Sequence, residues 1–517
     1  MSNNNPTVLE QLRGFPVFQM IIIMLLRLSE PIAFSSFLSY IFFMIKSFRI
    51  TKNDAEVSRY SGYLASAFSL SQFFSSVPWG IASDKFGRKP SILFGCMGTA
   101  FSMILFGFSK NFTLAFISRI LMGLLNGNVP IMRTTVGEIA VEKRHQGIAF
   151  SNLSLIWGLG KCIGAYLAGH LTDVDHFREY KRDEQPQEDS IFIKFPFAYT
   201  NIVIALLILN FCIIGWLFLE ETHDELKNKR DRGLEIGDKI RKLLGFEVPD
   251  RPWQMKKGES FETLIDENSI DYEDSEYEMQ SISSNEYVPI KIEEEPNIFT
   301  WPIIHRISCN FFISFSNIIY TEFFPIFLAK TIRPESLKIP FHMKGGFGYS
   351  TDSTGKLLSI TGLIGVIAVS LLFPIINKYF TILTAFRIGL MIIPILFFVI
   401  PLNLFTIPEY THSYSHTLTT TLLYLNAGFL SFFGSINNSQ MVLLIHRASP
   451  RKQRALINGY TISITALSRF IAPLIWGWVM SKFDLSGTGG LSWWLLAGEG
   501  LFVFGLSFIL NEDDEQD

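Results

Sequence analysis

Eight ionisable side chains lie inside long apolar runs, where a charge is costly in lipid and is expected to serve a function. They are Arg27, Glu30, Arg119, Lys161, Glu322, Arg387, Arg469 and Glu499. A carboxyl group in a low-dielectric cavity can take up and release a proton, and a buried cation can attract anionic groups. Glu30 and Glu322 are therefore the predicted proton carriers.

The spacing of these groups leaves several pairings open. Arg27 and Glu30 are three residues apart, so on a helix they face together, either as a structural pair or as a coupling site. Lys161 and Arg469 occupy matching positions in a repeat described below. They either flank a pathway and attract anionic or zwitterionic solutes, or pair with Glu30 and Glu322, or bond to neighbouring helices.

Membrane-spanning helices are the elements predicted to hold these groups. The 517 residues are 48% hydrophobic and only 18% charged, which indicates lipid as the solvent. A helix of about 20 apolar residues crosses about 30 Å of hydrocarbon and satisfies its own backbone polar groups. Such runs centre on Ile32, Leu70, Ser102, Gly123, Ile156, Leu206, Ile318, Val366, Ile392, Leu430, Ala466 and Val503. The predicted fold class is an all-α membrane protein of about twelve spans.

An internal repeat indicates two related halves. The matching positions, first half before second, are Lys161 and Arg469, Ala165 and Pro473, Gly169 and Gly477, and Asn126 and Asn437. A duplication in one orientation gives parallel repeats with a central pathway between them. We therefore add Asn126 and Asn437 to the predicted substrate or proton pathway, with Arg27, Glu30, Arg119, Lys161, Glu322 and Arg469.

The predicted domains follow from this division. They are a six-helix bundle in residues 1–220, a charged and mostly disordered cytoplasmic linker in 221–300, a second six-helix bundle in 301–511, and an acidic tail in 512–517. The linker changes from basic to acidic and Ser-rich, so a regulatory phosphorylated segment is the alternative. Its length favours cytoplasmic termini. The first apolar run is too long for a signal-peptide core.

A charged loop between the second and third spans carries the most specific motif. Its fixed positions are Gly80, Asp84, Lys85, Gly87, Arg88 and Lys89. They fit the loop signature G-x-x-x-D-[RK]-x-G-R-[RK], and the chain thereby resembles the major facilitator superfamily. The resemblance implies alternating access and a latch between the halves, with Asp84 and Arg88 as gate residues. Their implied charge partners are Glu138, Arg144, Glu220 and Glu221.

Further motifs narrow the resemblance. Arg119 and Gly123 fit the R-x-x-x-G pattern of the drug:proton antiporters, and Phe15-Pro16 with Glu30-Pro31 resembles a branch containing zinc-induced-facilitator-like carriers. This implies proton-coupled export, or loading of a vacuolar or endoplasmic-reticulum compartment, with a small solute. The helix-five antiporter signature is altered, because Lys161 is gained and Ala165 replaces its proline.

Other function classes find little support in the sequence. A net charge of −3 does not suggest a nucleic-acid partner. No GxxxxGK[ST] loop, catalytic triad or metal-ligand spacing occurs, so we expect no enzyme activity, no metal and no cofactor. The four cysteines lie in apolar runs and are predicted to be core residues. We expect a monomer. A transporter-like membrane sensor without net flux is the alternative function.

Overall fold

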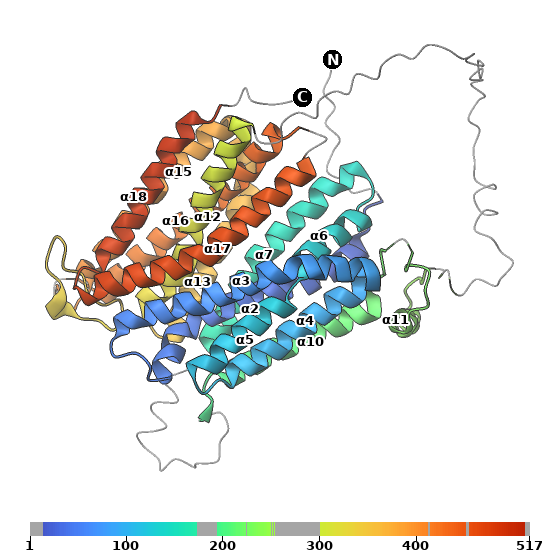
Figure 1. Cartoon of the computed structure of the whole chain (residues 1–517), viewed down its shortest axis with the longest axis horizontal. Coiled ribbons are helices and arrows are strands. Elements are labelled where there is room, and N and C mark those ends of the chain that lie inside the picture. Colours follow the sequence, from blue (N-terminus) through green and yellow to red (C-terminus); the bar gives the residue numbers. More distant parts are fainter. Residues whose placement is uncertain are drawn as a thin grey trace.

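The computed structural model describes residues 14–172, 194–223, 225–249, 251, 253, 300–411, 414–450 and 454–511. Figure 1 shows two groups of long helices that run side by side. The first group contains α2 (Val17–Ser47), α3 (Asp54–Phe86), α4 (Arg88–Gly107), α5 (Phe112–Leu125), α6 (Asn128–Ile139), α7 (Lys143–Leu171) and α10 (Ala198–Phe218). The second contains α12 (Trp301–Ala329), α13 (Thr351–Ile367), α14 (Phe373–Tyr379), α15 (Ile382–Leu402), α16 (His416–Ala448), α17 (Arg454–Leu485) and α18 (Gly490–Leu506).

Among the described residues, nine segments are long and apolar enough to cross a membrane. Each predicted span centre lies in a helix. The remaining long helices are α3, α7 and α16, of 33, 29 and 33 residues. They carry more polar side chains, and α3 buries several of its serines together with Gln72. Such helices fit a bundle interior better than a lipid face. The fold class is thus confirmed, and the number of twelve spans stays a prediction.

The duplication is visible in the packing of equivalent helices. A Cβ added to Gly95 of α4 would lie 2.0 Å from Oδ1 of Asn128, and one added to Gly389 of α15 would lie 2.0 Å from Oδ1 of Asn437. Both glycines therefore admit a buried asparagine from the next span. This contact pairs Asn437 with Asn128, whereas the sequence alignment paired Asn437 with Asn126.

The two groups of helices touch closely at one end. A Cβ added to Gly62 of α3 would lie 2.2 Å from the carbonyl oxygen of Pro473 in α17, and one added to Gly169 of α7 would lie 2.7 Å from Cα of Gly355 in α13. Small residues let these backbones approach. Ser66 Oγ also donates to the carbonyl of Phe470 at 2.9 Å. We call this the closed end.

At the other end the groups separate. Gly80 of α3 and Gly459 of α17 have no atom within 4 Å of an added Cβ among the described residues. Figure 1 shows α3 and α17 diverging in this direction. Because the start of α3 packs on the end of α17, Phe86 and Arg454 lie at the same end of the bundle. We call it the separated end.

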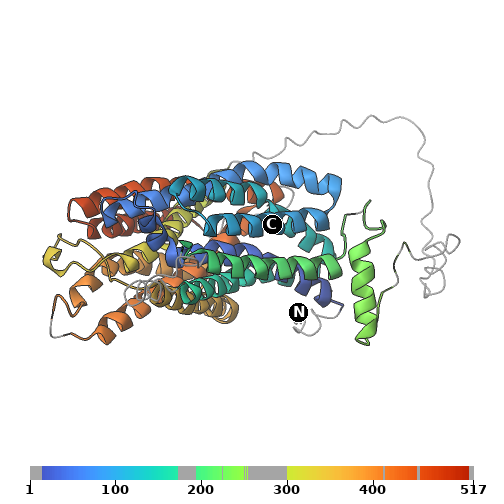
Figure 2. The same cartoon turned by 90° about the horizontal axis from the view of Figure 1, so that it is seen from below.

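The segment predicted as a mostly disordered linker differs from that expectation in its first part. It forms α11 (Arg232–Leu243), which lies across the end of α10 (Figure 2). Asp231 Oδ1 accepts hydrogen bonds from the amides of Gly233 and Leu234, at 2.8 and 3.2 Å, and so caps the helix. The high charge of the segment led to the prediction of disorder. In the fold several of these charges form ion pairs, which the sequence does not reveal. Residues 254–299 and 512–517 lie outside the described residues.

Candidate functional site

The loop between α3 and α4 is built around a glycine turn and a partly buried carboxylate. Gly87 has a φ of 104°, a left-handed conformation that favours glycine. Glu221, which follows α10, accepts hydrogen bonds from the amides of Arg88 and Lys89 at 2.9 and 3.1 Å. A carboxylate at a helix N-terminus is stabilised by these unpaired amides and by the helix dipole. Glu221 was predicted as a gate charge partner, and it binds the backbone at the start of α4.

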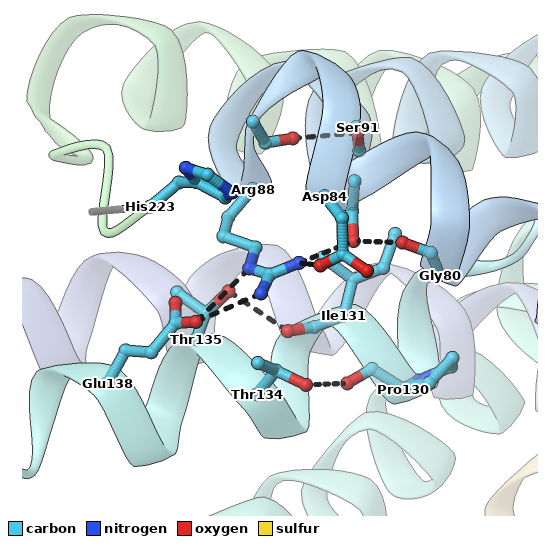
Figure 3. Close-up of polar contacts among 12 residues, drawn as sticks. Gly80, Asp84, Arg88, Ser91, Pro130, Ile131, Thr134, Thr135, Glu138 and His223 are labelled. Carbon is cyan, nitrogen blue, oxygen red and sulfur yellow. Dashed lines mark hydrogen bonds and ion pairs between the residues drawn. The ribbon is translucent and has the colours of Figure 1, made fainter. Parts of the chain in front are cut away.

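Arg88 joins three elements at the separated end. Its guanidinium lies between Asp84 of α3 and Glu138 of α6 (Figure 3), forming an ion pair with Asp84 and a second with Glu138 at 3.1 Å. Ser83 Oγ accepts a further hydrogen bond from the guanidinium at 2.8 Å. Thr222 donates to the other carboxylate oxygen of Glu138. The charge-assisted bonds therefore fix the ends of α3, α4 and α6 against one another.

The same loop is attached to α11. Lys89 is buried, and its Nζ lies 2.7 Å from Asp231, the residue that caps α11. Arg251 forms two hydrogen bonds of 2.8 Å with Asp238 of α11 and one of 2.7 Å with Glu220. The hydrogen bonds that Arg251 donates to the Asp238 and Glu220 carboxylates raise the pKa of Arg251 above its usual value, so this arginine stays charged. Sequence reasoning missed Asp231, Asp238 and Arg251.

The contacts of Arg88 can be compared with the latch that the resemblance implies, in which this loop binds the other half of the protein. Within the part of the chain that the structure describes, every contact of the Arg88 guanidinium lies in the first helix group. A bond from Arg88 to the second group is thus not formed in this arrangement, in which the helices are apart at this end. Gly80 lies on α3, and Lys85 is exposed with its Nζ 5.6 Å from the centre of the Phe86 ring. The side chain of Arg144 lies outside the described residues.

We expect Arg88→Ala to destabilise the folded protein. Removing the guanidinium leaves the half-buried Glu138 carboxylate without its cation, and an uncompensated partner of this kind costs roughly 1–3 kcal/mol. The midpoint of thermal unfolding in detergent should fall by roughly 1–3 °C, because the entropy of unfolding grows with the length of the chain. Lys85→Ala is the matched control, because it removes an exposed cation of the same loop. Equal midpoints for the two variants would contradict the structural role of Arg88.

A first charged group lies midway along the bundle. Arg27 and Glu30 of α2 form the predicted ion pair, and both are buried. Glu30 also accepts a hydrogen bond from Gln72 of α3 at 3.0 Å, and the Arg27 guanidinium lies 5.1 Å from the centre of the Trp157 ring. Arg469 of α17 is near enough to interact electrostatically with Glu30. Gln72 and Trp157 were not among the predicted residues.

A second charged group joins the two helix groups. Glu322 of α12 is 1% exposed, and its Oε2 has no hydrogen-bond partner among the described residues. Arg119 of α5 and Lys161 of α7 exert an electrostatic attraction on this carboxylate. Arg119 is itself 1% exposed and lies 4.1 Å from the centre of the Phe37 ring. Each group therefore places a carboxyl on one half near a cation on the other.

The predicted fourth span is interrupted beside the first group. Helix α5 ends at Leu125 and α6 begins at Asn128, so carbonyls at the break lose their helical partners. Side chains of α3 replace these partners. Ser75 donates to the Gly123 carbonyl at 2.9 Å, Trp79 to Leu124 at 2.8 Å and Gln72 to Asn126 at 3.4 Å. The buried Oδ1 of Asn126 stays without a hydrogen-bond partner in the described chain.

The remaining predicted residues lie elsewhere in the second half. Neither side-chain polar atom of the buried Asn437 has a hydrogen-bond partner among the described residues. Arg387 donates to the carbonyls of Ser507 and Leu510, which is a structural arrangement at a helix end. Glu499 accepts a hydrogen bond from Ser316. No group of three metal-binding side chains occurs in the described ranges, and the four cysteines are buried.

Comparison with known proteins gives these features their context. A model of the Major Facilitator Superfamily matches residues 23–473. The chain belongs to the major facilitator superfamily. It is 32% identical to the major facilitator superfamily multidrug transporter mfsB of Aspergillus fumigatus, over 93% of this chain and 81% of that protein. It is 26% identical to Protein ZINC INDUCED FACILITATOR 1 of Arabidopsis thaliana, over 89% and 83%.

A solved structure supports the same fold. The bacterial homologue of the human lysosomal transporter Spinster, in an inward-facing and unoccupied conformation, aligns with a TM-score of 0.64 at 11% identity, covering 98% of this chain and 99% of that chain. The resemblance drawn from the loop motif is thus confirmed. The chain is a multi-pass membrane protein of a transporter family, whose members carry small-molecule solutes.

Proposed function

We propose that this chain is a secondary-active, proton-coupled exporter that moves a small solute by alternating access. The observation that carries the proposal is the pair of charged groups in mid-bundle. Arg119 and Lys161 of the first half attract Glu322 of the second, and Arg469 of the second half attracts Glu30 of the first. Protonation of a carboxyl, or binding of a solute to one of the cations, therefore changes the attraction between the halves.

The carboxyls supply the proton coupling in this proposal. When Glu322 is ionised, its charge attracts Arg119 and Lys161 and favours the arrangement in which the halves approach. When Glu322 is protonated, that attraction is lost and the cations are available to an anionic or zwitterionic solute. Ion binding thus selects between two arrangements, which is the requirement for coupled transport.

The packing supplies the conformational change. The small-residue contacts of Gly62 and Gly169 hold the closed end, while the separated end carries the Arg88 loop. With cytoplasmic termini this arrangement is the inward-facing state. In the outward-facing state the Arg88 loop approaches the second half and the closed end opens. Rocking of one repeat against the other around a fixed central site is the motion expected of parallel repeats.

The direction and the membrane are part of the same proposal. One relative is named a multidrug transporter and another a zinc-induced facilitator, which supports transport of a small solute. From the sequence resemblance we propose antiport, with export from the cytosol or loading of a vacuolar or endoplasmic-reticulum compartment. The excess of cations near the central carboxyls favours a solute with an anionic group. We propose that the protein acts as a monomer, because each chain contains both repeats and the pathway between them.

Transport by the purified chain in liposomes tests the proposal. The vesicles are incubated with a low-molecular-weight cell extract, with and without a pH gradient, and their contents are analysed by mass spectrometry. We expect at least one solute to accumulate against its gradient, with a protonophore abolishing the accumulation. If the protonophore did not reduce the accumulation, transport would not be coupled to protons.

The second candidate is a membrane sensor without net flux. The lysine in the altered helix-five signature favours it, because Lys161 is attracted electrostatically to Glu322 of the other half. For a sensor we expect that a solute of the same extract raises the thermal unfolding midpoint of the protein. No solute should then accumulate in the vesicles. That result would replace the exporter by the sensor.

A further inference from the structure

Helix α11 presents a surface that the transport function does not use. The helix lies across the end of α10, and the spans run perpendicular to it (Figure 2). Gly233 and Gly237 bring it against α10, because added Cβ atoms would lie 2.2 Å from the Trp216 carbonyl and 2.0 Å from the Leu217 carbonyl. Helix α11 is therefore held where a membrane span ends, at the level of the lipid headgroups.

Three faces follow from the helical period of 3.6 residues. The packed face consists of Gly233, Leu234, Gly237 and Asp238, all buried. The apolar face consists of Ile236, Ile240, Leu243 and Leu244. The charged face consists of Arg232, Glu235, Lys239 and Lys242. The apolar face lies between the other two, as in a helix that rests against a protein on one side and enters a membrane surface with the next.

The apolar face is unusually exposed. Leu243 is 87% exposed and Leu244 is 65% exposed, and Phe246 beyond the helix end is 64% exposed. Ile236 is 43% exposed, as is Trp216 at the neighbouring end of α10. Tryptophan is enriched at the membrane interface. These residues form a continuous apolar surface that lipid can cover.

Two lysines beside this surface lie outside the ion pairs of the segment. Arg230 forms an ion pair of 2.6 Å with Glu235, and Arg251 is shared between Asp238 and Glu220. Asp231 is paired with Lys89. No carboxylate lies within ion-pair distance of Lys239 or Lys242 in the described part of the chain. The exposed cations of α11 are therefore available to anionic headgroups.

We propose that α11 is an interfacial anchor that binds anionic phospholipids. In this arrangement Leu243, Leu244 and Phe246 enter the boundary between headgroups and acyl chains. Lys239 and Lys242 contact the phosphate and carboxylate groups of the lipid. Polybasic and apolar residues on one helix together give stable binding to anionic membranes, because the two contributions add.

Quenching by brominated lipids tests the anchor. The chain's four cysteines are buried, so a fluorophore can be attached selectively to Leu243→Cys in the full chain. The labelled protein is placed in nanodiscs that contain either brominated phosphatidylserine or brominated phosphatidylcholine at equal mole fraction. We expect the serine lipid to quench several-fold more strongly. Lys239→Gln/Lys242→Gln should lower this preference at least about twofold, since each cation near an anionic surface contributes a modest share of the binding.

Two controls make the result specific. Lys52→Gln/Lys338→Gln removes the same charge from exposed lysines at the closed end, and it should leave the preference unchanged. Added salt should weaken the preference in the wild-type chain, because exposed charges are screened. Equal quenching by the two lipids would overturn the binding of anionic headgroups. Quenching by neither lipid would overturn the contact with the membrane.

Discussion

Glu322→Gln is expected to abolish proton-driven transport while solute exchange without a pH gradient continues. The glutamine keeps the shape of the side chain and cannot ionise, so Arg119 and Lys161 lose the charge that distinguishes the two protonation states. We expect the gradient-driven rate to fall roughly 100-fold, as is common when an essential proton-transfer group is lost. The rates are measured in liposomes with and without a pH gradient.

Two further variants separate coupling from folding. Glu499→Gln is the matched control, because Glu499 is a carboxyl of the same half that binds Ser316 and takes no part in the cross-half group. It should keep proton-driven transport. Lys161→Met/Glu322→Gln removes one of the two uncompensated cations and should restore part of the thermal stability without restoring the coupling. If Glu322→Gln retained its response to the pH gradient, Glu322 would not be the proton carrier.

The second large effect is expected at the closed end. A methyl group at Gly62 would lie 2.2 Å from the backbone oxygen of Pro473, and backbone atoms cannot move aside as a flexible side chain does. Overpacking of this kind costs about 1–3 kcal/mol, which changes the population of the closed end by roughly 5- to 150-fold. Gly62→Ala should therefore favour the opposite arrangement of the halves and slow transport.

Cysteine accessibility measures this shift. Ser66 is 3% exposed at the contact with α17, so Ser66→Cys should react slowly with a membrane-impermeant maleimide. Adding Gly62→Ala should accelerate the reaction at least about fivefold if the closed end opens. Gly498→Ala on α18 is the matched control, because an added Cβ there meets no described atom within 4 Å. Equal reaction rates in Gly62→Ala and Gly498→Ala would exclude a steric role for Gly62 in closure.

The sequence predicted those parts of the site that depend on local spacing. Arg27 and Glu30 are one helical turn apart, and the structure forms their ion pair. The motif around Gly87 identified the loop and the family. Only a few residue types can form a tight turn with charges at fixed positions, so such a loop leaves a recognisable pattern in the sequence. The interruption after Leu125 was not predicted, since it depends on Ser75, Trp79 and Gln72 of another helix.

Helix α11 shows a second limit of sequence reasoning. Averaged over residues 221–300, the high charge indicated disorder. The helix forms because Asp231 caps it and because Gly233 and Gly237 allow it to pack on α10. The partner of Asp238 is Arg251, which lies beyond the helix. Tertiary pairing of this kind has no fixed spacing, so no sequence pattern reveals it.

The attachment of α11 determines how a mechanical load on the central segment reaches the bundle. A pull on the chain beyond Arg251 acts first on Asp238 and Glu220, and then through Asp231 and Lys89 on the beginning of α4. The force is thus divided between α10 and the Arg88 loop, and α10 does not have to unwind before the loop is displaced. A pull on the segment between the halves would therefore load the Arg88 loop at the same time as the membrane span α10.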